Sequence, residues 1–246
     1  MNGPPDLPLA AFHWVEYIGL LGGIGSFVVR RLGRQPPAVA WARPPMAMAF
    51  AAAAAGGAGV LVQSPSLPTL LRVIVELSAL VACVRGIRVV APLAVLGCVL
   101  LAPAGHAAGI GPLGPGAGYI DAVHVLAAGM WAGGVVALGS LRPPAGWTAP
   151  DARQLIGRFA PVAAVAFALT ALTGVLRAVG QVGEVTQLWT TQYGVILLLK
   201  CAGVVVMLAL APAWTRRSGI ARLEAVAAIF VVALTALLAA FPLPVN

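Results

Sequence analysis

The chain contains, at residues 121–134, the stretch DAVHVLAAGMWAGG, in which an acid and a histidine interrupt an otherwise apolar run. A long apolar run without period-two alternation predicts a helix rather than a strand. The helical repeat places Asp121, His124, Ala128 and Trp131 on one face. Ionisable groups at membrane depth are costly, so they are usually paired or functional. This face is therefore a candidate binding face within a membrane.

The composition predicts a membrane protein with many spans. Hydrophobic residues make up 61% of the 246 residues and charged residues 9%, whereas a soluble domain carries about 25% charged residues. Eight apolar segments each approach the ~20 residues that a membrane-spanning helix needs. They cover approximately residues 8–29, 44–63, 68–85, 87–104, 118–140, 155–179, 191–214 and 220–241. We therefore expect an all-α, polytopic fold of eight transmembrane helices that forms a single domain over residues 1–246.

The basic residues predict the orientation of these helices. Twelve of the fifteen fall in alternate loops between the expected spans: Arg30, Arg31, Arg34, Arg43, Arg85, Arg88, Arg142, Arg153, Arg158, Arg216, Arg217 and Arg222. The positive-inside rule places these loops in the cytoplasm and both the N-terminus and the C-terminus outside. The same rule accounts for the formal net charge of +8, so we expect membrane lipid and no nucleic acid as a partner.

The three histidines share the outer half of the membrane under this topology. His13 and His124 lie one to two turns inside the outer ends of their helices, and His106 ends the fourth helix. Imidazole binds zinc, copper, iron and nickel, so the three form a candidate metal site. Asp121 is expected to orient His124 through its second ring nitrogen, a common role beside a bound metal. A polar contact between helices or a helix cap is the alternative role for each histidine.

Further charged residues lie at membrane depth. Glu16 and Glu76 share the outer half, and Lys200, the only lysine, lies near mid-membrane. Lys200 needs a partner or deprotonation there, and Glu16, Glu76 and Asp121 are the candidates. Arg72 and Glu76 are four residues apart and are expected to pair. Such a network either holds the bundle together or compensates charge and relays protons during metal movement.

Two aromatic residues and two methionines complete the candidates. Trp131 shares the face of His124, and Tyr193 opens a helix at the outer level, where aromatic residues also anchor helices at the interface. Met46 and Met48 lie near the inner end of the 44–63 helix. Thioether sulfur is a soft metal ligand, suited to ions such as Cu(I), so the two methionines are either an exit site for a metal ion or ordinary packing residues.

A weak internal repeat relates two parts of the chain. His13 and His124 are each followed, nine and ten residues later, by a pair of glycines. The repeat predicts a 4+4 arrangement of parallel halves, residues 8–104 and 118–241, about an axis along the membrane normal. The glycine pairs would let helices approach closely. Chance matching between helices rich in glycine and alanine is the alternative.

A set of short motifs follows in order along the second half of the chain. They are Gly105-His106-Ala107, Asp121-x-x-His124 with Trp131-x-Gly133-Gly134, Thr173-Gly174, Leu188-x-x-Thr191-x-Tyr193-Gly194, Leu199-Lys200, and Glu224 with Pro242. Over residues 105–242 this set resembles the copper resistance protein D (CopD/PcoD) family. The resemblance implies a multi-pass protein of the bacterial inner membrane that handles or moves copper. It also implies a separate periplasmic copper-binding partner of the CopC type.

We therefore expect copper binding and transport at an outer site built from His13, His106 and His124. Cu(I) is the expected ion, and uptake is the direction that the resemblance implies. No enzymatic activity is expected, and the chain lacks the Walker signature of an ATP-driven pump. Two other functions stay open. Two histidines on neighbouring helices can ligate haem b in a membrane redox protein, and the chain can also be a structural or assembly subunit of a larger membrane complex.

Overall fold

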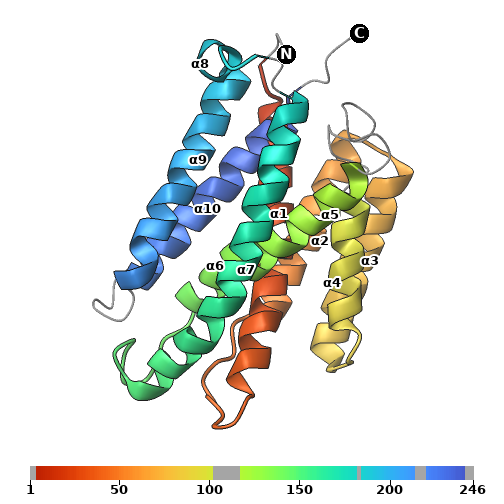
Figure 1. Cartoon of the computed structure of the whole chain (residues 1–246). Coiled ribbons are helices and arrows are strands. Elements are labelled where there is room, and N and C mark those ends of the chain that lie inside the picture. The colour runs from red at the N-terminus through yellow and green to blue at the C-terminus, as the bar shows by residue number, and fades with distance from the viewer. Residues whose placement is uncertain (1–3, 102–116, 182–183, 214–219, 242–246) are drawn as a thin grey trace.

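The computed structural model describes residues 4–101, 117–181, 184–213 and 220–241, and every regular element in these ranges is a helix (Figure 1). The elements are α1 (Leu7–Gly33), α2 (Met46–Gln63), α3 (Leu67–Arg85), α4 (Val90–Leu101), α5 (Ala117–Ala128), the π-helical segment η3 (Gly129–Gly133), α6 (Gly134–Gly139), α7 (Pro150–Gln181), α8 (Gln187–Thr190), α9 (Gln192–Leu210), the 3-10 turn η4 (Ala211–Ala213) and α10 (Ile220–Ala239). The prediction of an all-α, polytopic membrane protein is confirmed.

Seven helical regions in the described residues are long and apolar enough to cross a membrane. They agree with seven of the eight expected spans, and α5, η3 and α6 together form one of them, Gly118–Gly139. The remaining expected span, 87–104, corresponds to α4, of which twelve apolar residues are described. The count of eight therefore stays a prediction.

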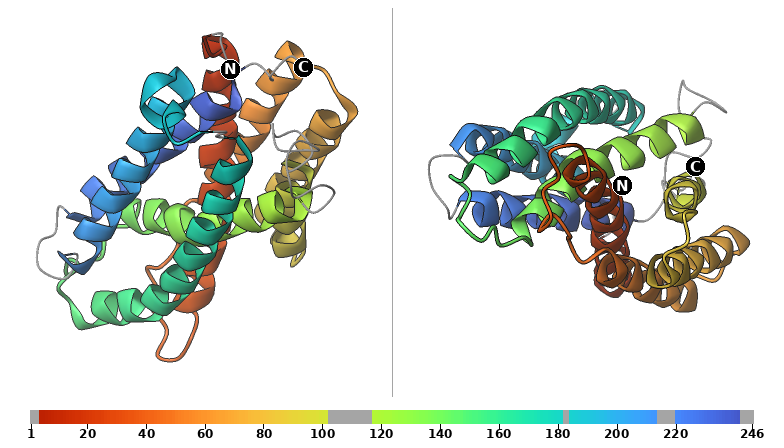
Figure 2. Two further views of the ribbon diagram at one scale, coloured as in Figure 1. Left: turned by 45° about the horizontal axis from the view of Figure 1, so that its top comes forward. Right: turned by 90° about the horizontal axis from the view of Figure 1, so that it is seen from below.

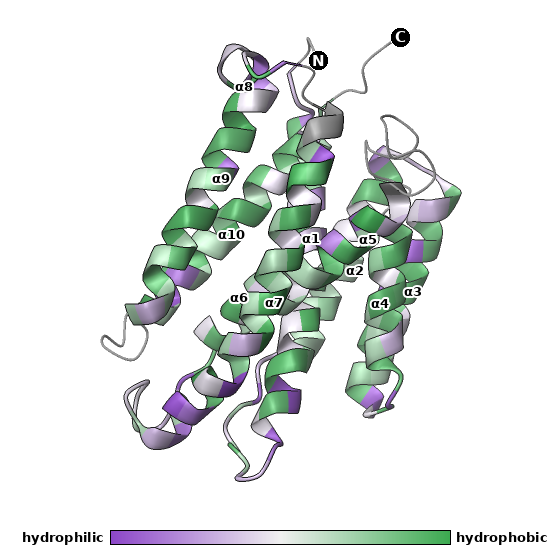
Figure 3. Ribbon diagram, viewed as in Figure 1, coloured by the Kyte–Doolittle hydropathy of each residue, from purple (hydrophilic) through white to green (hydrophobic). Residues whose placement is uncertain are grey.

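The two described ends of the chain meet at one end of the bundle. The backbone N–H of Asp6, before α1, donates to the carbonyl of Ala240, after α10, at 3.0 Å. Figure 3 shows hydrophilic residues concentrated at the opposite end, where the arginine-rich loops lie. Opposite ends of the bundle thus carry the two described chain ends and the described basic loops, as the positive-inside argument requires. The side of the membrane that each end faces stays a prediction.

Side-chain caps fix where several helices begin. The Asp6 carboxylate accepts the backbone N–H of Leu9 at the start of α1, and Ser66 does the same for Thr69 in α3. Such caps satisfy N–H groups that have no partner inside the helix. At the other end of α3, Gly86 adopts a left-handed conformation with φ of +68°, which glycine allows without a steric penalty.

Helix α1 lies in the middle of the molecule, between α2 on one side and η3, α6 and α10 on the other (Figure 2). It crosses η3 at backbone contact distance. A Cβ on Gly25 would overlap the backbone of Gly133, and a Cβ on Gly133 would overlap the carbonyl of Leu21. The close approach expected from the glycine pairs therefore holds for Gly133. Turns of π-helix are rare and frequently lie at functional sites, so this crossing marks the region that carries the site.

Candidate functional site

A cavity of about 170 Å³ opens between α1, α5, η3, α7, α9 and α10. It lies toward the end of the bundle where the described termini meet. Its lining is mostly apolar, and its polar residues are Tyr17, Asp121, His124, Thr170, Arg177, Tyr193, Lys200 and Thr235. The four residues that were predicted to share one helical face, from Asp121 to Trp131, all line this cavity.

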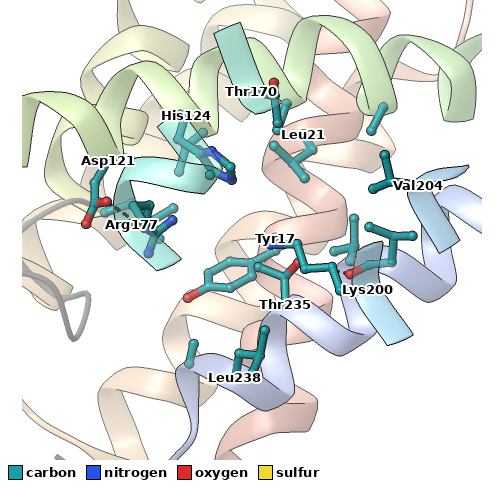
Figure 4. Close-up of a pocket in the computed structure, with 18 of the residues that line it drawn as sticks. Tyr17, Leu21, Asp121, His124, Thr170, Arg177, Lys200, Val204, Thr235 and Leu238 are labelled. Atoms are coloured by element: carbon teal, nitrogen blue, oxygen red, sulfur yellow. Dashed lines mark hydrogen bonds and ion pairs between the residues drawn. The ribbon is translucent and has the colours of Figure 1, made fainter. Parts of the chain in front are cut away.

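His124 is held in a defined orientation at the cavity wall (Figure 4). Its ring is buried, with 7% of the residue exposed, and its Nδ1 lies 2.9 Å from the hydroxyl oxygen of Thr173 on α7. The Thr173 hydroxyl donates its own hydrogen to the carbonyl of Leu169 at 2.6 Å. A hydroxyl has only one hydrogen to give, so this arrangement favours the tautomer in which Nδ1–H of His124 donates to Thr173. In that tautomer, the neutral ring keeps a lone pair on Nε2.

The neighbouring residue Gly174 makes room for this ring. A Cβ at Gly174 would lie 3.4 Å from Cε1 of His124, so a larger side chain there would crowd the imidazole. The pair Thr173-Gly174 thus supplies both the hydrogen-bond partner and the space. In the sequence, the signals of this arrangement are a small residue directly after a threonine in an apolar helix and the place of Thr173-Gly174 among the motifs quoted above.

Asp121 does not orient His124, contrary to the prediction. Its carboxylate pairs with Nε of Arg177 on α7 at 2.8 Å, and Thr173 bonds the imidazole instead. A buried carboxylate needs a compensating charge, and the guanidinium on the facing helix supplies it. Figure 4 shows Arg177 beside Asp121, with Lys200 on the other side of Tyr17.

Lys200 lines the cavity without a salt bridge to any acid in the described part of the chain. Two of its predicted partners are engaged elsewhere, because Asp121 pairs with Arg177 and Glu16 with Arg72. Since Asp121 neutralises Arg177, Lys200 is the cation at this cavity wall that no described acid offsets.

Trp131 also lines the cavity, and it packs edge-on against Phe167 with ring centroids 4.9 Å apart.

A second polar cluster lies between α1 and α3. Nε of Arg72 lies 2.5 Å from Oε1 of Glu16, and its Nη2 donates to Oε2 at 3.2 Å. Nδ1 of His13 lies 3.4 Å from the same Oε2. The predicted pair between Arg72 and Glu76 is wrong, because the long arginine side chain reaches across to α1. His13 belongs to this cluster and is not among the residues that line the cavity.

The remaining predicted ligands are not brought together in the described residues. His106 lies outside the described ranges. Met46 is buried, whereas Met48 is 72% exposed, so the two thioethers face different surroundings. In the part of the chain that the structure describes, no group of three or more His, Cys, Asp or Glu residues is arranged to hold a metal.

The fold and cavity define a polytopic helical membrane protein with a mostly apolar chamber inside its bundle, into which a few polar side chains point. A family model described as copper resistance protein D matches residues 153–240, which include most of α7 and all of α9 and α10. This match confirms the predicted resemblance to the copper resistance protein D family over the C-terminal part of the chain. Thr173, Arg177 and Lys200 lie within the matched segment, and His124 precedes it. No curated protein and no solved structure matches the chain.

Proposed function

We propose that the protein binds copper as its cargo in this cavity and moves it across the membrane, with Nε2 of His124 as the anchoring ligand. The observation that carries the proposal is the bond between His124 and Thr173. Metal-binding histidines almost always donate their other ring N–H to a fixed acceptor, which sets the tautomer and the ring orientation. The family match supports a copper-related membrane protein, and imidazole is a suitable copper ligand.

His106 is the proposed second ligand. It follows Leu101 by five positions in the sequence, and Leu101 lines the cavity. His13 stays a predicted ligand, but its nearest charged neighbour is Glu16. We therefore place its main role in the cluster between α1 and α3.

The charge of the cavity suits passage rather than permanent storage. A unit positive charge about 8 Å from a bound cation costs about 2 kcal/mol at an effective dielectric constant near 20. Lys200 would therefore weaken copper binding, and an ion in transit must leave as well as enter. The rest of the lining is apolar, so it excludes water that would compete for copper. The ion therefore has few protein ligands to leave when it departs.

Direction, location and partner follow from the family resemblance. We propose uptake across a bacterial inner membrane, with copper delivered to the cavity by a periplasmic partner of the CopC type. The role is binding and transfer rather than catalysis. Haem with two histidine ligands is less well supported, because one histidine, His124, lines the described part of the cavity.

Elemental analysis of purified protein tests the proposal. Wild type, His124→Ala and His13→Ala are produced in copper-supplemented cells and compared by mass spectrometry for copper and iron. We expect near-stoichiometric copper in wild type, most of it retained in His13→Ala and nearly all of it lost in His124→Ala. Equal copper in folded His124→Ala and wild type would refute the site, and stoichiometric iron would favour haem.

A further inference from the structure

Glu76 on α3 is a buried acid that the copper site does not use. It is 1% exposed, and neither of its carboxylate oxygens has a hydrogen-bond partner in the described part of the chain. The titratable and charged groups around it are Glu16 on α1, Arg72 on its own helix and Cys98 on α4. Helix α2 contributes Gly57, which carries no charge.

The carboxyl groups of Glu76 and Glu16 converge at Gly57. A Cβ built on Gly57 would lie 2.7 Å from Oε2 of Glu76 and 3.1 Å from Oε1 of Glu16. Because Gly57 on α2 has no side chain, both carboxyl groups fit at this point. Two carboxyl groups that share one buried site do not both ionise readily, because their negative charges repel each other.

The single guanidinium in this cluster is committed to Glu16. Arg72 contacts both Glu16 oxygens, through Nε and Nη2, so the charge of Glu16 is offset. An ionised Glu76 would add a second negative charge without a direct partner. A buried ion without a partner loses its hydration and gains nothing in exchange, so its burial is costly. A proton on Glu76 removes that cost.

A line of polar side chains joins this cluster to the cavity. His13 lies 3.4 Å from Glu16, the ring centroids of His13 and Tyr17 are 5.3 Å apart, and Tyr17 lines the cavity. Tyr17 and His13 both carry groups that accept and donate protons. A change of charge in the cavity can therefore reach the carboxyl pair through neighbouring side chains on α1.

We propose that Glu76 is a proton-binding site that releases its proton when copper enters the cavity and takes up a proton when copper leaves. The coupling rests on the proposed copper function. Entry of the cation favours ionisation of Glu76, whose O–H bond breaks, so the carboxylate stays and the proton leaves toward the cavity along the side of α1 that carries Glu16, His13 and Tyr17. Departure of the copper reverses the step, and no electron is transferred.

The proton on Glu76 is tested first by infrared spectroscopy of the full chain in lipid, without copper. We expect a carbonyl band from a protonated carboxyl group at neutral pH that is absent in Glu76→Gln. Glu184→Gln, in an exposed loop, is the matched control and keeps the band. Absence of the band in wild type, or its persistence in Glu76→Gln, would overturn the proposal.

The coupling is tested by adding Cu(I) in weak buffer with a pH-sensitive dye. We expect wild type to release about one proton per bound copper and to lose the infrared band. Glu76→Gln and a second variant, Glu76→Ala, should bind copper and release no proton. Copper binding without proton release in wild type would refute the coupling. If wild type binds no copper, the copper function fails, and the infrared result still decides whether Glu76 holds a proton.

Discussion

Replacement of Thr173 by valine isolates the bond that orients His124. Valine has nearly the shape of threonine but lacks the hydroxyl that lies 2.9 Å from Nδ1. The buried Nδ1–H then lacks an acceptor, or the ring changes tautomer and loses the Nε2 lone pair. A buried polar group left without its partner costs about 1–3 kcal/mol. Since 1.4 kcal/mol corresponds to a tenfold change in affinity, we expect copper affinity to fall about 5- to 150-fold.

Competition with a chromogenic Cu(I) chelator measures this loss in detergent. Thr170→Val is a close control, because Thr170 lines the same cavity and its hydroxyl donates to the carbonyl of Ala166 instead of His124. We expect that control to stay within about twofold of wild type, since it changes no group that we place on the metal. Thr173→Ser keeps the hydroxyl and should retain most of the affinity. Equal affinities for Thr173→Val and wild type would refute the reasoning.

Three further results are expected. Lys200→Met removes a positive charge from the cavity wall. By the Coulomb estimate of about 2 kcal/mol, it should raise copper affinity by up to about 30-fold and slow copper release. Unchanged affinity and release rate would show that Lys200 does not weaken copper binding. Gly133→Ala places a Cβ against the Leu21 carbonyl and should destabilise the bundle by about 1–3 kcal/mol or more, seen as a lower melting temperature in detergent. Gly157→Ala is the control, because the added Cβ on α7 meets open space, and it should be neutral or slightly stabilising since alanine favours helix. Equal melting temperatures for Gly133→Ala and Gly157→Ala would contradict the close contact between α1 and η3.

The helices could be predicted from the sequence because hydrophobicity and length decide them. The spans expected at 8–29 and 118–140 correspond to Leu7–Gly33 and Gly118–Gly139. The shared face of Asp121 and His124 also follows from the helical repeat alone. The π-helical segment η3 was not predicted, because it depends on the helix that packs against it.

The partners of the polar side chains could not be predicted in the same way. His124 and Thr173 are 49 residues apart, and Glu16 and Arg72 are 56 apart. Such pairs depend on how each helix is rotated about its axis, and that rotation is set by packing between helices. Spacing along one helix favoured the pair of Arg72 with Glu76, but the long arginine side chain found its acceptor on α1.

The crossing of α1 and η3 also has a mechanical consequence. Backbone meets backbone there, at Gly25 and Gly133, and the side chain of Ile24 lies against Gly129 beside that contact. Because the two backbones already touch, α1 and η3 cannot move closer together at this point. The proposed transport requires the chamber to open first to one side of the membrane and then to the other. At this crossing, such a change of shape has to come from tilt or rotation of the helices, because closer packing of α1 against η3 is blocked.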